Sequence, residues 1–113
     1  MDSRSIVSAC LTAAAMLALA APVGAADVDA GKKKVQEVCA ACHGPSGAEP
    51  TTPEYPKLAG QYPDYLAKAL RDYKSGQRKN PIMAGMAAGL TNADIENVSA
   101  YFYAQPGNLA SRY

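Results

Sequence analysis

Two cysteines and a histidine stand close together in Cys39-Ala40-Ala41-Cys42-His43. Thiols at this spacing can add to the two vinyl groups of a haem, and the histidine that follows them can coordinate the iron. On a short helical turn the two sulfur atoms lie on one side, and the next imidazole can reach beneath the porphyrin. The segment predicts one covalent haem c, bound through Cys39 and Cys42, with His43 as an axial ligand.

The same C-x-x-C spacing also occurs in zinc sites and in thioredoxin-like redox sites. A zinc site needs further ligands, but His43 is the only histidine of the chain and Cys10 is its only other cysteine. A thioredoxin-like site lies within a βαβ unit, and this chain, rich in alanine, glycine and proline, shows no such pattern. The residues therefore favour haem attachment over both alternatives.

The first 26 residues have the layout of a cleavable secretory signal. Arg4 supplies the positive charge at the start, residues 6–21 are apolar, and small residues precede the expected cleavage after Ala25 or Ala26. The alternative is a retained anchor, but the apolar run is shorter than the ~20 residues of a spanning helix. We therefore expect export to the periplasm, removal of residues 1–26, and no stable membrane insertion afterwards.

The rest of the chain, residues 27–113, is expected to form one domain. A domain of this size has difficulty in building a sufficient hydrophobic core alone, and a haem would complete that core. The formal net charge of the chain is +1, which gives no attraction to nucleic acid or to a lipid surface. No repeat and no second C-x-x-C-H is present, so we expect a single haem.

Apolar spacing of three and four residues, together with capping signals, predicts three main helices. The first is capped by Asp29 and runs to about Val38, the second runs from Pro63 to a stop at Gly76, and the third runs from Asn92 to about Gln105 behind the capping pair Thr91 and Asp94. Prolines and glycines in residues 44–60 predict an irregular loop around the haem edge, and a second irregular stretch is expected before the third helix. The tail, residues 107–113, is expected to be a frayed end, with docking of a partner as the alternative.

Three stretches in this order resemble class I bacterial c-type cytochromes: C-A-A-C-H, then Y-P-K-L-A-G-Q, then N-P-I-M-A-G-M-A-A-G-L-T-N-A-D-I-E-N-V-S-A-Y-F. The chain resembles in particular the single-haem periplasmic cytochromes that are related to one half of the two-haem cytochrome c-four group. The resemblance implies an all-α class I cytochrome c fold, with about three main helices and irregular loops around one covalent haem. It also implies that the first and last helices cross, with Gly31 against Tyr101 or Phe102.

A methionine thioether is a soft, neutral sixth ligand that favours ferrous iron and closes the metal to other molecules. Met83 and Met86 both lie at a suitable distance along the chain, and a methionine is by default a packing residue. The resemblance implies that Met83, seven residues before Leu90, is the ligand. It also implies that the backbone carbonyl of Pro56 accepts the Nδ1 proton of His43 and so orients the ring.

Several polar residues near these positions have two interpretations each. Asn80 can donate a hydrogen bond to the Met83 sulfur, or it can serve as a turn residue. Tyr55, Tyr62 and Tyr65 can reach the haem propionates, or they can pack with their hydroxyls in water.

Two classes of function fit these residues. The first is a one-electron carrier that moves electrons between larger donor and acceptor proteins through a weak, transient interface. The second is a haem enzyme, which needs an open iron site and a distal acid or base, and the lack of a second histidine disfavours it. We therefore predict a carrier and not an enzyme, and the alternative left open is a haem-bearing subunit of a dehydrogenase, such as a flavoprotein oxidising a sulfur compound.

Overall fold

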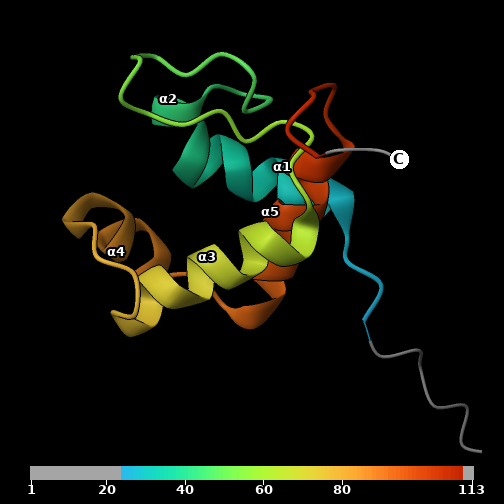
Figure 1. The fold of residues 1–113 in the computed structure, drawn as a ribbon. Coiled ribbons are helices and arrows are strands. Elements are labelled where there is room, and N and C mark those ends of the chain that lie inside the picture. The colour runs from blue at the N-terminus through green and yellow to red at the C-terminus, as the bar shows by residue number, and fades with distance from the viewer. Residues whose placement is uncertain (1–23, 111–113) are drawn as a thin grey trace, which may run out of the picture.

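The structure is a computed structural model and describes residues 24–110. It is all-α in this part of the chain, which confirms the predicted fold class (Figure 1). The helical elements are α1 (Val28–Lys34), η1 (Val35–Cys39), α2 (Ala40–His43), α3 (Pro63–Ser75), α4 (Pro81–Ala88) and α5 (Asn92–Ala104). Within residues 24–110 no helix is long and apolar enough to cross a bilayer. All but the last three residues of the expected signal lie outside the described residues.

The first helix begins slightly earlier than the sequence predicted. Asp27, not Asp29, is the N-cap, and its carboxylate accepts a hydrogen bond of 3.0 Å from the amide of Ala30. Asp29 lies in the first turn, where its negative charge still favours the positive end of the helix dipole. Either aspartate satisfies the sequence rule for a cap, and the backbone conformation selects between them.

The same helix also continues beyond Val38, where it was expected to end. Elements α1, η1 and α2 follow one another without a break, so that the helix reaches His43. In the π-helical part the amide of Ala40 donates a hydrogen bond to the carbonyl of Val35. A π turn holds one residue more than an α turn, which rotates the side chains that follow to another face of the helix. Gly44, with a φ of 82°, then ends the helix.

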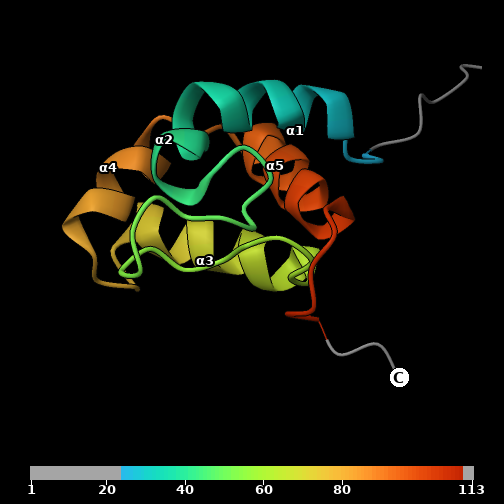
Figure 2. The same cartoon turned by 90° about the horizontal axis from the view of Figure 1, so that it is seen from above.

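Helices α1 and α5 lie against each other in both views of the fold (Figures 1 and 2). Their closest approach is at Gly31, where an added Cβ would lie 2.0 Å from the Asn97 carbonyl oxygen and 3.1 Å from the Cβ of Tyr101. The predicted crossing is therefore confirmed, with Tyr101 as the aromatic partner. Around it Val35 and Val98 are fully buried.

Helix α3 packs against α5 and connects the crossing to the rest of the molecule. It begins at Pro63 and ends at Gly76, which adopts the left-handed conformation with a φ of 85°, as predicted. The predicted capping box of α5 is also present: the amide of Asp94 donates to the hydroxyl of Thr91 at 3.1 Å, and the amide of Thr91 donates to the Asp94 carboxylate at 2.9 Å.

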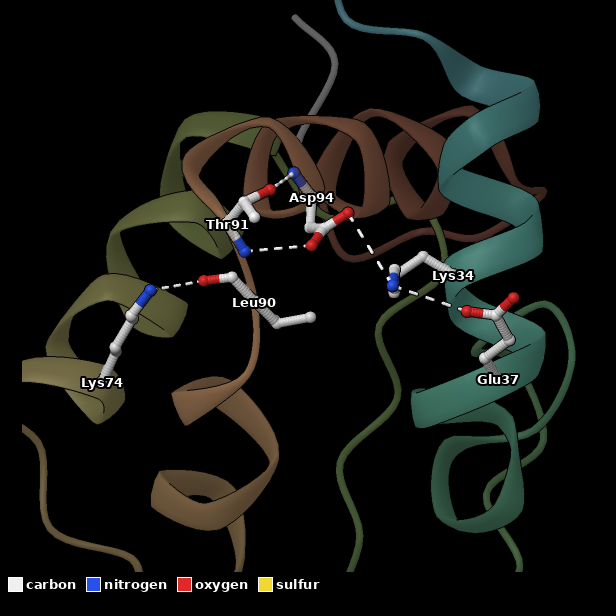
Figure 3. A network of polar contacts seen from close by, with 6 residues as sticks. All are labelled: Lys34, Glu37, Lys74, Leu90, Thr91 and Asp94. Atoms are coloured by element: carbon white, nitrogen blue, oxygen red, sulfur yellow. Dashed lines mark hydrogen bonds and ion pairs between the residues drawn. The ribbon is translucent and has the colours of Figure 1, made fainter.

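The start of α5 is joined to α1 and α3 by polar contacts (Figure 3). The ammonium of Lys34 on α1 lies 3.9 Å from the carboxylate of Asp94 and 3.4 Å from that of Glu37. From α3, the ammonium of Lys74 donates to the carbonyl oxygen of Leu90. Partly exposed ion pairs stabilise a fold only slightly, so we attribute to them a role in fixing the relative placement of the helices.

Helix α4 corrects the expectation of an irregular stretch before the last helix. Asn80 is its N-cap, and the carboxamide oxygen accepts hydrogen bonds of 3.0 Å from the Ile82 amide and 3.1 Å from the Met83 amide. Pro81 occupies the first helical position, where its missing N–H costs nothing. Gly85 lies within the helix in open space. Proline and glycine often break helices, but here Pro81 begins the helix and Gly85 only weakens it.

The C-terminal segment is ordered as far as it is described, so the expected fraying is wrong for residues 107–110. Ala110 is 7% exposed, and its amide donates a hydrogen bond of 3.2 Å to the carbonyl of Gly60. The amide of Gly60 in turn donates to the carbonyl of Phe102 at 2.8 Å. These contacts hold the segment on the loop before α3, and residues 111–113 lie outside the described part of the chain.

Candidate haem site

A cavity of about 420 Å³ lies between the C-terminal part of the first helix, the loop before α3, and the helices α3, α4 and α5. This size falls within the range of about 300–1,000 Å³ that is typical of cofactor pockets. The two predicted attachment cysteines, the two predicted iron ligands and the predicted partner of the histidine all line it, namely Cys39, Cys42, His43, Met83 and Pro56. Most other lining residues are apolar, and they include Val38, Leu58, Leu66, Leu70, Ile82, Leu90, Val98 and Phe102.

His43 is buried at the end of α2, and its ring is fixed by a backbone group. Its Nδ1 lies 2.9 Å from the carbonyl oxygen of Pro56, the contact that the resemblance implied. A carbonyl oxygen can only accept a hydrogen bond, so Nδ1 must carry the proton. In a neutral imidazole this leaves the lone pair on Nε2, which is the atom free to bind a metal.

Cys39 and Cys42 are free thiols that line the same cavity and are half-buried. Burial raises the pKa of the Cys39 thiol to about 11, and the nearby Lys34 charge offsets only part of that effect. The side chain of Cys39 also packs against the main core cluster. Within residues 24–110 no group of three or more histidine, cysteine, aspartate or glutamate side chains is arranged to hold a metal ion.

Met83 and Met86 both line the cavity from successive turns of α4. Met83 is half-buried, whereas Met86 is 46% exposed. The Met83 backbone is held by the side-chain oxygen of Asn80, which identifies Asn80 as a helix cap and leaves its carboxamide nitrogen for a bond to the sulfur. Greater burial and the anchored backbone distinguish the first methionine from the second.

The tyrosines lie at different places relative to the cavity. Tyr55 lines it, and its ring centroid is 6.1 Å from that of His43. The pKa of Tyr55 is raised, chiefly by its electrostatic interaction with Cys42. Tyr65 also lines the cavity, from α3, whereas Tyr62 is not among the lining residues.

Among the polar residues of the cavity that sequence reasoning missed are Tyr73, Arg78 and Ser99. The guanidinium carbon of Arg78 lies 5.0 Å from the centre of the Tyr73 ring. The hydroxyl of Ser99 is buried without a hydrogen-bond partner. A tyrosine, an arginine and a serine at helical or loop positions carry no motif, so nothing in the sequence singled them out.

Comparison with known proteins places this site in a family. Residues 28–103 match the family model "Cytochrome c". The chain belongs to the cytochrome c family. Over 80 residues it is 45% identical to cytochrome c4 of Thiocapsa roseopersicina, which is 71% of this chain and 41% of that protein. Over 84 residues it is 40% identical to cytochrome c-554(548) of Halomonas halodenitrificans, which is 72% of this chain and 99% of that protein.

Two solved structures agree with this assignment. Reduced recombinant cytochrome c4 from Pseudomonas stutzeri superposes with a TM-score of 0.63 at 36% identity, over 74% of this chain and 52% of that chain. A thiosulfate dehydrogenase from Marichromatium purpuratum superposes with a TM-score of 0.66 at 32% identity, over 71% of this chain and 19% of that chain. The chain thus spans about two fifths of the cytochrome c4 sequence above, and its relation to one half of such a protein is confirmed.

Haem c is therefore the cofactor of the chain, and the cavity fits it. A mostly apolar slot suits the porphyrin, two free thiols line it, and a buried imidazole has its Nε2 available. When bound, the haem supplies an iron that alternates between the ferric and ferrous states. Cys39, Cys42 and His43 are the residues that would hold it, and the apolar lining of the cavity would exclude water from it.

Proposed function

We propose that the chain is an exported one-electron carrier whose haem c is held by Cys39 and Cys42 and ligated by His43 and Met83. The observation that carries the proposal is that His43 and Met83, from elements far apart in the sequence, line one apolar cavity. Two thioether bonds prevent loss of the haem. Ligands on both faces close the iron, so that an electron can pass through the haem edge while substrates cannot coordinate.

The roles of the individual residues follow from their surroundings. The Pro56 carbonyl keeps the proton on Nδ1 of His43 and holds its ring in one orientation. Met83 supplies a neutral sulfur, which raises the reduction potential by favouring the ferrous state. The residues that α4 and its cap Asn80 contribute to the cavity are Asn80, Ile82, Met83 and Met86, none of which can donate or accept a proton in the physiological range. Such a wall suits electron transfer better than acid–base catalysis.

The same residues suit a haem-bearing subunit of a dehydrogenase, which is the second candidate. It is favoured by the similarity to a structure described as a thiosulfate dehydrogenase. Gel filtration of the natively purified protein separates the two functions. A free carrier elutes at the size of one domain or a small oligomer, whereas a subunit elutes together with a larger protein that carries the catalytic site.

Export is part of the proposal, with residues 1–26 as the signal and residues 27–113 as the mature cytochrome domain in the periplasm. Covalent haem attachment prevents loss of the cofactor by diffusion after secretion. N-terminal sequencing of protein from a periplasmic fraction is expected to begin at Ala26 or Asp27. Recovery of the intact first 26 residues in a membrane fraction would contradict cleavage and support a retained anchor.

The experiment that tests the ligands is the optical spectrum of the purified protein and of two variants, Met83→Ala and Met86→Ala. Oxidised wild type is expected to show the weak far-red band of sulfur bound to iron, and its reduced form is expected to ignore carbon monoxide. Met83→Ala should lose that band and bind carbon monoxide. Met86→Ala, one turn further along the same helix, is the matched control and should behave as wild type.

If only Met86→Ala loses the band, the ligand assignment is wrong although the carrier function stands. Wild type that binds carbon monoxide readily would instead show an open iron site. That result would overturn the electron-carrier proposal and favour a haem enzyme or a gas-binding protein.

A further inference from the structure

One edge of the cavity differs from its apolar walls because it contains a guanidinium group. Arg78 lies in the short segment between α3 and α4, directly after the turn at Gly76. The only other cation in the cavity lining is Lys57, and the only carboxylate there is Glu54. A haem has apolar faces and two propionate carboxylates on one edge, and a carboxylate that is partly removed from water is stabilised by a cation.

The Arg78 side chain is held by two tyrosines of α3. Its guanidinium lies over the ring of Tyr73, with 5.0 Å between the guanidinium carbon and the ring centre. A hydrogen bond with Tyr65 is the main cause of a raised pKa of Arg78, and Tyr73 contributes to the same shift. Both tyrosines line the cavity with it. The backbone amide of Arg78 donates a hydrogen bond of 3.0 Å to the carbonyl of Asp72, so the segment that carries it is also fixed.

No carboxylate of the described chain takes up this charge. The ion pairs within residues 24–110 use Lys34, Lys68 and Arg71 as their cations. The contacts of the Arg78 guanidinium are instead with aromatic rings and hydroxyls, which neutralise no charge. A positioned guanidinium of this kind at the border of an apolar cavity is suited to an anionic ligand.

We propose that Arg78, held by Tyr65 and Tyr73, binds a propionate of the haem. The inference rests on the proposed function and adds the residue that orients the haem within its slot. A guanidinium presents two parallel N–H groups to a carboxylate, and such charge-assisted pairs are among the strongest hydrogen bonds of proteins. The hydroxyl of Tyr65 is placed to add a further donor.

This assignment has a consequence for the reduction potential. Ferric haem carries one positive charge more than ferrous haem, so an ionised propionate stabilises the ferric state. Arg78 offsets that negative charge and thereby raises the potential. Its removal leaves the propionate uncompensated beside the iron, and the potential must fall.

The test compares three variants: Arg78→Met, Arg78→Lys and Lys57→Met. The first keeps an unbranched stem against Tyr73 and removes the charge. The second keeps the charge but loses the paired donors. The third removes Lys57, the other cation of the cavity lining, and tests it as the competing partner of the propionate. Each protein is measured by resonance Raman spectroscopy of the propionate-bending band and by a redox titration at one fixed pH.

We expect Arg78→Met to shift the propionate band and to lower the midpoint potential. Arg78→Lys should shift the band and lower the potential less. Lys57→Met should leave the band in place. An unshifted band in both Arg78 variants, or a shift caused by Lys57→Met alone, would overturn the inference. The far-red sulfur-to-iron band of the same samples separates the two proposals, because its absence from wild type contradicts the ligation by Met83 and leaves the propionate result to be judged by itself.

Discussion

The crossing of α1 with α5 and the cavity beside α4 are built in opposite ways. At the crossing, Val35 and Val98 are fully buried, and Gly31 brings two backbones into contact. At the cavity, large apolar side chains remain open to it, and Ile82 is 55% exposed. The first region is completed by atoms of the chain, whereas the second requires atoms that the chain does not supply.

This difference shows how a small domain can fold around a cofactor. The crossing buries its apolar surface by itself and fixes the end of the first helix, which carries both cysteines and His43. The cavity then positions α4 and its methionines for a flat group that buries the remaining apolar surface. A haem bound there would be the redox centre and would also complete the hydrophobic core.

Of the changes that test this comparison, removal of the haem should have the largest effect on helix content and thermal stability. In the double variant Cys39→Ser with Cys42→Ser, no covalent haem is expected on a denaturing gel. Far-UV circular dichroism should show a loss of helix and of most of the cooperative thermal transition, because the cavity wall loses its apolar partner. Cys10→Ser is the matched control, since that cysteine lies in the expected signal. A double variant that melts like wild type would show that the crossing alone stabilises the domain.

A methyl group added at the crossing of α1 with α5 should have the next largest effect on stability. Gly31→Ala places a methyl group 2.0 Å from the Asn97 carbonyl oxygen, so the two helices must separate. We expect a loss of about 3 kcal/mol in the free energy of unfolding, at the upper end of the cost of overpacking. Denaturant titration of the haem-loaded protein measures it. A variant as stable as wild type would contradict the close approach of α1 and α5.

The capping box of α5 gives a smaller effect with a pH dependence. Thr91→Ala should lower the free energy of unfolding by about 1 kcal/mol at neutral pH, and Thr91→Ser should retain most of it. The amide of Thr91 is the main cause of a lowered pKa of Asp94. Because the folded-state pKa of Asp94 lies below its ordinary value, the stabilisation that the ionised Asp94 carboxylate provides is present at neutral pH. It is lost as the pH falls through the folded-state pKa.

Denaturant titrations of wild type and Asp94→Asn at neutral and at acid pH test the direction of this pH dependence. The difference in free energy of unfolding between the two proteins should shrink at the acid pH, because the protonated wild-type carboxyl group is then uncharged, like the amide of the variant. A difference that grows on acidification would contradict the assignment.

The smallest expected effect is in α4 beside the cavity. Here a substitution should raise the free energy of unfolding, whereas the changes above lower it. An added Cβ at Gly85 in α4 meets nothing within 4 Å. Gly85→Ala should therefore stabilise the protein by about 0.5–1 kcal/mol, because alanine is the better helix former. The same substitution thus destabilises at the crossing and stabilises near the cavity. Destabilisation by Gly85→Ala would show that α4 is packed more closely than the structure indicates.

The sequence anticipated the elements that depend on local chemistry. The limits of α3 and the capping box of α5 were predicted because proline, glycine and a threonine–aspartate pair act on their own backbone. The prediction was wrong at the cap of α1, where two aspartates could each serve as the cap. It was also wrong at α4, where proline and glycine occupy positions that a helix tolerates. The order of residues 107–110 depends on contact with Gly60, which no local pattern reveals.

The sequence by itself determined the cofactor and its attachment, because C-x-x-C-H is a short-range chemical requirement that any fold must keep. It also named the histidine and two methionines as candidate ligands, and the family resemblance added the carbonyl of Pro56. Only the tertiary structure decided which groups share one cavity, how deeply each methionine is buried, and that Arg78 stands at its edge beside two tyrosines. These properties arise from contacts between residues far apart in the chain, where distance, burial and charge depend on how the helices pack.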